Sequence, residues 1–475
     1  MGASGGGGGG GAASSAPLLP RPGGQGSLAM VMASTGVAVL GSFVFGVAIG
    51  YSAPTQSKIR DDLQLSLSEY SFFGSIITIG AMIGAVASGY LADIAGRKGA
   101  MRISALVCIV GWLAIFFAQG AASLDFGRFC TGFGVGVFSY VVPVFIAEIA
   151  PKALRGGLTT LNQLLLCTGL SVTYIVGTIV TWRMLVIAGL VPCIILIIGL
   201  FFIPESPRWL VIKAPLNNKQ IQIFEPEFEF SSNSNSKPRV YIYIQAKVGR
   251  QKEFEIALQR LRGKHADVSL EAVEIREFIE AIERLPKGGV EDLFNRAYAR
   301  PVVVGVGLMV FQQFVGINGI LFYASETFVS AGFASGDLGT ILMGCIQAPI
   351  TAVGALLMDR SGRRPLLLIS TSGLLIGSLM SGISFFLKNN GLYLEQVPII
   401  ALTGILVYIA SYSIGMGAVP WVIMSEIFPI NIKGIGGSFV TLVNWSGSWA
   451  VSFAFNFFMS WSSSGEPKKT PAMFS

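Results

Sequence analysis

The stretch Asp-Ile-Ala-Gly-Arg-Lys at residues 93–98 decides the fold, because a near copy, Asp-Arg-Ser-Gly-Arg-Arg, occupies residues 359–364. A long apolar run precedes each copy. A second pair of matching stretches follows in the same order, with a glutamate, a proline and a base at equal spacing in residues 148–155 and 426–433. Internal symmetry of this kind indicates a helical bundle built from two like halves repeated in tandem.

The composition indicates that this bundle lies in lipid. Of the 475 residues, 52% are hydrophobic and 12% are charged, and the mean hydropathy is +0.66. Soluble domains carry about 25% charged residues, so we predict an all-α polytopic membrane protein that has the lipid bilayer as its partner. The net charge of +7 does not indicate a nucleic-acid partner, because the basic residues lie mainly in loops beside apolar runs.

Apolar runs near the 20 or so residues that a span requires recur eleven times along the chain. The predicted spans are 29–51, 69–91, 101–120, 124–149, 157–180, 184–203, 301–329, 336–358, 366–387, 398–424 and 436–461. They divide into an N-terminal transmembrane half at 29–210 and a C-terminal half at 301–461. The Gly-rich tail at 1–28 is predicted to be disordered, and residues 246–300 to form short cytosolic helices.

The repeated stretches carry a candidate gate. An acid at one helix end and bases on the neighbouring loop can form a charge cluster, and the basic residues place it on the cytosolic side. When formed, the cluster closes that side, and when broken and hydrated, it lets that side open. The alternative is that the bases only set the topology and cap helices. The predicted gate residues are Asp93, Gly96, Arg97, Glu148, Arg155, Asp359, Gly362, Arg363, Arg364, Glu426 and Lys433.

A polar stretch in the seventh predicted span, residues 311–326, carries a candidate binding site. Its carboxamides need hydrogen-bond partners that lipid cannot supply, and they offer donors and acceptors that match the hydroxyls of a sugar. Gly316 and Gly319 are predicted to unwind the backbone and turn the amides toward one cavity. The alternative is that the amides bond only to neighbouring helices. These carboxamides are Gln312, Gln313 and Asn318.

With these motifs in place, the chain resembles the sugar porter family of the major facilitator superfamily. Further stretches that carry the likeness are Gly-Arg-Phe-Cys-Thr-Gly-Phe-Gly at 127–134, Pro-Glu-Ser-Pro-Arg-Trp-Leu at 204–210 and Gly-Ala-Val-Pro-Trp at 417–421. The stretch at 45–54, Phe-Gly-Val-Ala-Ile-Gly-Tyr-Ser-Ala-Pro, is similar to plant monosaccharide transporters of the early-responsive-to-dehydration type. The resemblance implies the major facilitator fold, with two six-helix-type halves, and a transporter rather than an enzyme.

The resemblance also implies roles for individual residues. An indole such as that of Trp421 would cover the apolar face of a sugar while amides bond its rim. The gate would gain Arg128, Glu205 and Arg208. The implied substrate-binding residues between the halves are Gln163, Gln312, Gln313, Asn318, Gln347, Trp421, Asn444 and Trp445.

Ala48 marks a departure from the family. Family members that couple sugar to protons often carry an aspartate there, in the first span, and a carboxylic acid that meets each side in turn is the simplest proton carrier. Ala48 therefore favours facilitated diffusion, or coupling through another acid such as Asp125 or Glu148. No bound cofactor or metal is expected, so a proton is the one coupling species considered.

Two segments also depart from the family. Residues 211–245 are rich in Asn, Ser and Lys and interrupt the family pattern. We interpret them as a retained intron, with a genuine flexible insertion as the alternative. The atypical tail at 462–475 contains no apolar span, so the family's twelfth helix is expected to be missing and transport to be impaired.

The predicted function is transmembrane transport of a monosaccharide, a hexose such as glucose, by alternating access, either facilitated or proton-coupled. The alternatives are a transport-impaired truncated isoform with a regulatory role, and a facilitator of another small polar solute. We expect a monomer in the vacuolar membrane, with the plasma membrane as the alternative location. The sequence leaves open which sugar is carried and what drives the flux.

Overall fold

The computed structural model describes residues 25–151, 154–213, 252–263, 266–284, 290–296, 298–330, 332–333, 335–429 and 432–463. The predicted tail up to residue 24, the end of the chain from 464 and most of the predicted insertion lie outside these residues. The helices of the N-terminal half are α1 (Gln25–Gly50), α2 (Ser52–Leu63), α3 (Leu67–Phe116), α4 (Ala121–Ile149), α5 (Arg155–Ile179), α6 (Trp182–Phe202) and α7 (Pro207–Lys213).

Helix α3 folds back on itself and supplies two of the predicted spans. Its 50 residues include Gly96, whose backbone is non-helical at φ +82° and ψ 170°. A Cβ on Gly84 would meet Phe133 of α4, and a Cβ on the next residue of α4, Gly134, would meet Ser104. The stretches on either side of Gly96 therefore lie against the same level of α4, as two antiparallel spans do.

The C-terminal half contains two interrupted helices. The predicted span at 301–329 is divided at Gly316 and again at Tyr323, and the span at 398–424 contains a π-helical turn. The elements are η3 (Val290–Phe294), α10 (Ala299–Phe314), α11 (Ile317–Phe322), α12 (Ala324–Ser330), α13 (Gly336–Ser361), α14 (Arg363–Asn389), α15 (Val397–Ser411), the π-helix η4 (Tyr412–Met416), α16 (Val419–Ile427) and α17 (Lys433–Ser463).

The described helices agree with a polytopic membrane protein. Eight of them are long and apolar enough to cross a membrane. Since α3 counts twice, and the broken α10–α12 and α17 add two more, the number of spans is close to the eleven predicted. All the elements described are helical.

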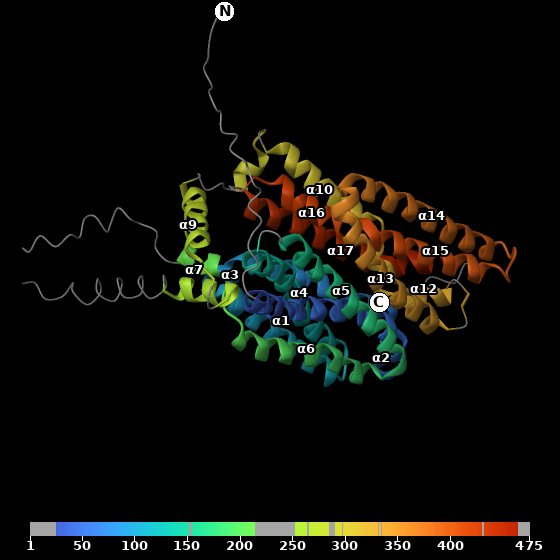
Figure 1. Cartoon of the computed structure of the whole chain (residues 1–475). Helices are drawn as coiled ribbons and strands as arrows, with labels where there is room; N and C mark the ends of the chain where they lie inside the picture. The colour runs from blue at the N-terminus through green and yellow to red at the C-terminus, as the bar shows by residue number, and fades with distance from the viewer. Residues whose placement is uncertain are drawn as a thin grey trace, which may run out of the picture.

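The two halves lie side by side, and different helices lie at the two ends of the bundle (Figure 1). Helix α7 and helix α9 (Ser269–Arg284) lie at one end, which we call the α9 end. Helices α2 and α12 lie at the opposite end, which we call the α2 end. Residues 252–262 form a further helix, whose Phe254 and Leu258 pack on Leu210 of α7 and Ile279 of α9. The predicted helices of the insert are thus docked on the N-terminal half.

Close backbone contacts hold the N-terminal half together. A Cβ on Gly46 of α1 would lie 2.0 Å from the Leu166 carbonyl oxygen of α5, and one on Gly169 of α5 would lie 2.3 Å from the Phe43 carbonyl oxygen. Only glycine permits such an approach. Small residues of this kind let helices pack by van der Waals contact in lipid, where the hydrophobic effect does not drive them together.

Candidate functional site

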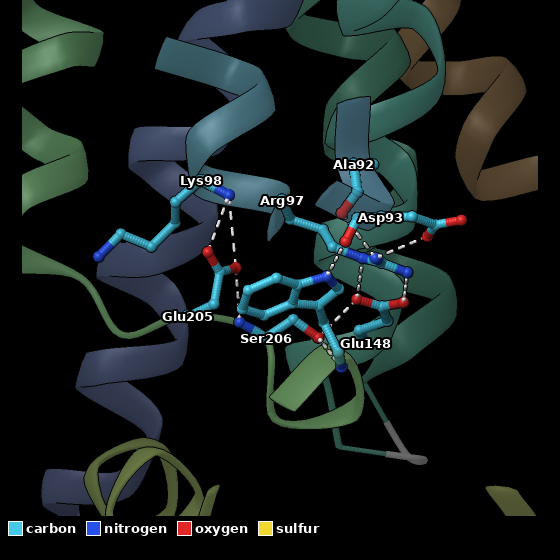
Figure 2. A network of polar contacts seen from close by, with 8 residues as sticks. Ala92, Asp93, Arg97, Lys98, Glu148, Glu205 and Ser206 are labelled. Atoms are coloured by element: carbon cyan, nitrogen blue, oxygen red, sulfur yellow. Dashed lines mark hydrogen bonds and ion pairs between the residues drawn. The ribbon is translucent and has the colours of Figure 1, made fainter. Parts of the chain in front are cut away.

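A buried ion pair at the α9 end forms the centre of the predicted gate (Figure 2). The positive φ of Gly96 reverses the chain directly before Arg97, and the last turn of α4 presents Glu148. Arg97 donates from Nε and Nη2 to the two carboxylate oxygens of Glu148, both at 2.9 Å. The two side chains are only 8% and 11% exposed. This bidentate geometry is the strong form of an arginine–carboxylate pair.

Helix α7 is tied to the same ion pair. Ser206, at the entrance to α7, donates its hydroxyl to Glu148 at 2.5 Å. The indole Nε1 of Trp209 donates to the Asp93 carbonyl at 3.0 Å, and Arg97 also reaches the Ala92 carbonyl at 3.1 Å. Figure 2 shows these groups converging on one point. These contacts join α3, α4 and α7 within the N-terminal half and do not cross to the other half.

Glu205 lies in the loop before α7 and is half-buried beside Gly96. Its carboxylate accepts the backbone N–H of Lys98 at 3.2 Å and that of Ser206 at 2.9 Å. Burial raises the pKa of Glu205, and these N–H donors oppose the shift. The Lys98 ammonium donates to the Ile203 carbonyl instead. The loop is therefore held to the turn at Gly96 by hydrogen bonds between side chains and backbone groups.

The C-terminal half repeats this arrangement in a more exposed form. Gly362 has the same backbone angles as Gly96, φ +82° and ψ 170°. Arg363 follows it and donates to Glu426 at 2.8 Å, as Arg97 does to Glu148. Here, however, the side chains are 38% and 50% exposed. The two halves therefore share the same backbone turn and the same ion pair, but only the ion pair of the N-terminal half is buried.

The remaining predicted gate residues are placed less uniformly. Arg208 lies with its guanidinium 5.4 Å from the ring centre of Phe278 on α9, and Arg364 is exposed. Arg155 is half-buried, and its Nε has no partner among the described residues. The side chains of Asp359 and Lys433 lie outside the described residues.

Arg128 does not belong to the gate, contrary to the prediction. It precedes Glu148 by twenty residues on α4, which separates them by about 30 Å along the helix. The side chain is fully buried and donates to the Ala48 carbonyl at 2.6 Å, near the end of α1. The resemblance alone placed Arg128 with the gate, whereas the predicted span at 124–149 already puts Arg128 and Glu148 near opposite ends.

The predicted binding stretch lies at a true break in the helix. Gly316 adopts φ +91°, and Gln312 just before it is 1% exposed. Gln312 donates to the Met416 carbonyl at 2.7 Å and accepts from Asn444 at 3.0 Å. Met416 ends the π-helical turn, whose altered hydrogen bonding leaves carbonyls for side chains to satisfy. In this conformation Gln312 therefore fits the structural alternative, a bond between helices.

The break also brings two other amides together. Asn318 donates its side-chain amide to Gln313. Five residues apart on a straight helix, they would lie about 140° apart around its axis. Gly319, predicted to unwind the chain with Gly316, instead stays helical within α11. A Cβ there would lie 2.2 Å from the Phe455 ring, so glycine is needed for close packing. Gly316 alone makes this turn.

Three buried polar atoms near this region have no partner among the described residues. They are Gln347 Oε1 on α13, and Trp445 Nε1 and Ser448 Oγ on α17. Trp445 is 6% exposed, and its ring lies 5.9 Å from that of Phe45 on α1, across the two halves. Buried polar groups are nearly always paired, so unpaired ones between the halves point to a polar ligand.

Gln163 lies in a second polar string, between α5 and α13. It donates to the thiol of Cys167 at 3.7 Å, and Thr351 of α13 donates to the same sulfur at 3.3 Å. Thr351 also bonds the carbonyl of Gln347 at 2.8 Å. Sequence reasoning missed Cys167 and Thr351, because a cysteine or a threonine in an apolar run, unlike a carboxamide, can be satisfied within its own helix.

Trp421 is not placed against the amides by any described contact. It is half-buried and belongs to an apolar cluster with Met309, Phe428 and Val440. Met309 lies 3.4 Å from the amide nitrogen of Asn444, so the cluster borders the amide group. The predicted stacking of Trp421 on a sugar therefore stays a prediction.

Two like halves that meet around buried amides, with matching ion pairs at one end, define a membrane transporter of the major facilitator type. The chain belongs to the sugar transporter family: the family model "Sugar (and other) transporter" matches residues 34–225 and 241–473. The unmatched residues 226–240 lie within the predicted insertion at 211–245.

The relatives are plant sugar transporters. Sugar transporter ERD6-like 16 of Arabidopsis thaliana is 59% identical over 439 residues, which cover 92% of this chain and 84% of that protein. Sugar transporter ERD6-like 7 of the same plant is 56% identical over 436 residues, covering 92% and 86%. The structure of XylE, a proton:xylose symporter bound to 6-bromo-6-deoxy-D-glucose, matches with a TM-score of 0.70 at 26% identity, covering 91% and 90%.

Proposed function

We propose that this protein carries monosaccharides across a membrane by alternating access. The similarity to sugar transporters over nine-tenths of the chain supports transport and does not favour the regulatory alternative. The observation that carries the proposal is the set of buried, unpartnered groups on Gln347, Trp445 and Ser448. An amide oxygen, an indole N–H and a hydroxyl are complementary to the hydroxyls of a sugar.

The contacts between the halves support an inward-facing conformation. The Arg97–Glu148 and Arg363–Glu426 pairs are formed in it, each within one half, so these pairs alone do not close the α9 end as predicted. Hydrogen bonds that join the halves lie around the middle of the bundle and at the α2 end, which would be the outer side. The basic residues of the repeats mark the α9 end as cytosolic. The donors and acceptors of these five bonds are Tyr174 and Leu321, Tyr323 and Ser71, Gln56 and Glu326, Thr351 and Cys167, and Ser446 and Met82.

The test is uptake of labelled hexoses and pentoses by cells that lack their own hexose carriers. Expression of the chain is expected to give saturable uptake that unlabelled sugar inhibits. Expression of the same chain with Gly46→Val, which would force α1 away from α5, serves as the inactive control. Uptake no greater than in this control, from protein shown to reach the membrane, would overturn the proposal.

We further propose facilitated diffusion as the mode of transport. Arg128 is buried in the N-terminal half and bonds the carbonyl of Ala48, where proton-coupled relatives would place a carboxylate. In proteoliposomes, sugar is expected to equilibrate across the membrane and not to exceed its external concentration when a proton gradient is imposed. Accumulation of sugar against its gradient would contradict this. We expect the vacuolar membrane as the location, which a fluorescent fusion in plant cells would reveal.

Replacing Gln347 with leucine is expected to weaken sugar binding without lowering the free energy of unfolding. Because Oε1 of Gln347 has no partner in the described structure, a similarly sized apolar side chain removes a buried polar group without orphaning another. Sugar affinity should fall about 5- to 150-fold, since a lost hydroxyl partner costs about 1–3 kcal/mol. The unfolding free energy should stay equal or rise.

Gln312→Leu is the matched control. It leaves the Met416 carbonyl and the Asn444 amide without their present partner, so unfolding free energy should fall by about 1–3 kcal/mol. Affinity measured by quenching of tryptophan fluorescence and stability measured by denaturant titration would test both variants. Equal decreases of the unfolding free energy in Gln347→Leu and Gln312→Leu would contradict the expected difference between them.

A further inference from the structure

Helix α2 is fastened to the N-terminal half by several polar contacts. Lys58 donates to carbonyl groups at the end of α5, at 2.8 Å for Gly177 and 3.0 Å for Val180. Near the end of α2, Asp62 pairs with Arg183 of α6 at 2.6 Å. Tyr70 of α3 donates to the carbonyl at the start of α2 at 2.7 Å. Helix α2 therefore moves with the N-terminal half as one body.

Helix α12 belongs to the other half and rests on α2. It follows the break at Tyr323 and packs against α13, where a Cβ on Gly339 would meet Phe328. Across the joint, Gln56 of α2 donates its side-chain amide to the carboxylate of Glu326 on α12. Of the five hydrogen bonds between the halves named above, this one alone includes a carboxylate.

The surroundings of Glu326 contain few other groups that titrate near neutral pH. The charged and titratable groups that face it are Arg60 on α2, Tyr70 on α3 and Tyr323 at the start of α12. Helix α13 brings Asp337 in its first turn. Arginine stays charged, and a tyrosine in water titrates only near pH 10. Glu326 is therefore the acid at this joint that is both half-buried and bonded to the opposite half.

We propose that Glu326 and Gln56 form a proton-sensitive latch that holds the two halves together at the α2 end. The latch rests on the proposed function, since it acts on the opening of this end during alternating access. In the present conformation the carboxyl group is enclosed between α2 and α12. When this end opens, α12 leaves α2 with its half, and the carboxyl group meets water without its amide partner.

Proton binding by Glu326 and opening of the α2 end are then linked. A titratable group whose surroundings differ between two conformations binds protons with different affinity in each, and by reciprocity pH shifts the balance between them. Glutamine at position 326 keeps an oxygen that accepts from Gln56 but cannot titrate. Alanine removes the acceptor altogether. The two substitutions therefore separate the contact from its response to pH.

The experiment measures the opening directly, without sugar. Spin labels on Asp61→Cys and Asn390→Cys report the separation of the halves, because both positions are exposed at the α2 end, one in each half. The background is the full chain in lipid nanodiscs with Cys345→Ala, which removes the exposed native cysteine. Distance distributions are recorded by pulsed electron spin resonance between pH 5 and pH 8.

The parent protein is expected to change its ratio of open to closed conformers at least threefold over this range. Glu326→Gln should flatten that response, and Glu326→Ala should raise the open fraction roughly tenfold, as loss of a hydrogen bond to a charged group implies. Glu395→Gln, an exposed acid in the loop at the same end, is the control and should keep the parental response.

A parental response retained in Glu326→Gln, or no pH response in the parent, would overturn the proposal. So would an unchanged distribution in Glu326→Ala. Because the measurement needs no substrate, a protein that fails to carry sugar but opens in a Glu326-dependent manner would contradict only the proposed function.

Discussion

Replacing Arg97 with alanine is expected to lower the free energy of unfolding by about 3–5 kcal/mol, the usual effect of removing one partner from a buried ion pair. The substitution leaves the Glu148 carboxylate, 11% exposed, with Ser206 as its remaining described hydrogen-bond donor. A carboxylate without its cation in a low-dielectric site is strongly disfavoured. The loss should appear as a shifted midpoint in denaturant titration of the purified protein.

The internal repeat supplies a matched control, Arg363→Ala. That arginine makes the equivalent pair with Glu426, but both side chains are more than a third exposed, so the loss should be below about 1 kcal/mol. Similar losses at the two positions would show that burial does not distinguish the two copies. Sugar selectivity should be unchanged in both variants, because neither residue contacts the candidate binding region.

Replacing Gly96 with alanine is expected to have the second large effect. The backbone at φ +82° and ψ 170° is open almost only to glycine, and another residue there costs about 1–3 kcal/mol. The new Cβ would also lie 2.6 Å from a carboxylate oxygen of Glu205, which adds about 1–3 kcal/mol of overpacking. The sum should lower the yield of folded protein and the denaturation midpoint.

Gly362→Ala separates these two contributions. Gly362 has the same φ and ψ, but nothing lies within 4 Å of its added Cβ, so only the backbone strain should remain. Combining Gly96→Ala with Glu205→Ala should recover the overpacking part, which a double-mutant cycle would measure. Equal destabilisation by Gly96→Ala and Gly362→Ala would contradict the clash with Glu205.

Much of the fold could be predicted because its signals are local. Runs of about 20 apolar residues place spans wherever they occur, and the repeated stretches at 93–98 and 359–364 show that the two halves are alike. The ion pairs of Arg97 and Arg363 followed from the repeat, since equal spacing places equal charges at equal helix ends. Arg128 was assigned to the gate by the resemblance alone, although it lies near the start of the predicted span at 124–149 and Glu148 lies at its end.

The candidate site was predictable in its residue types and less so in its contacts. Amides in an apolar run had to be paired, but the sequence left the partners of Gln312 open between a ligand and a neighbouring helix. The partners proved to be a carbonyl of a π-helical turn and Asn444, more than a hundred residues away. Such a pairing depends on how α10, η4 and α17 pack, and no spacing in the chain records it.

The sequence by itself determined that this is a two-part helical bundle in lipid, because hydropathy and repeated motifs act along the chain and need no partner. Only the tertiary structure decided which buried polar atoms lack a partner among the described residues, which ion pair is buried and that Glu326 meets Gln56. These outcomes depend on packing between segments distant in sequence, where burial sets the energy of each polar group. The similar motifs at Arg97 and Arg363 therefore form ion pairs that differ in burial and in their expected contribution to stability.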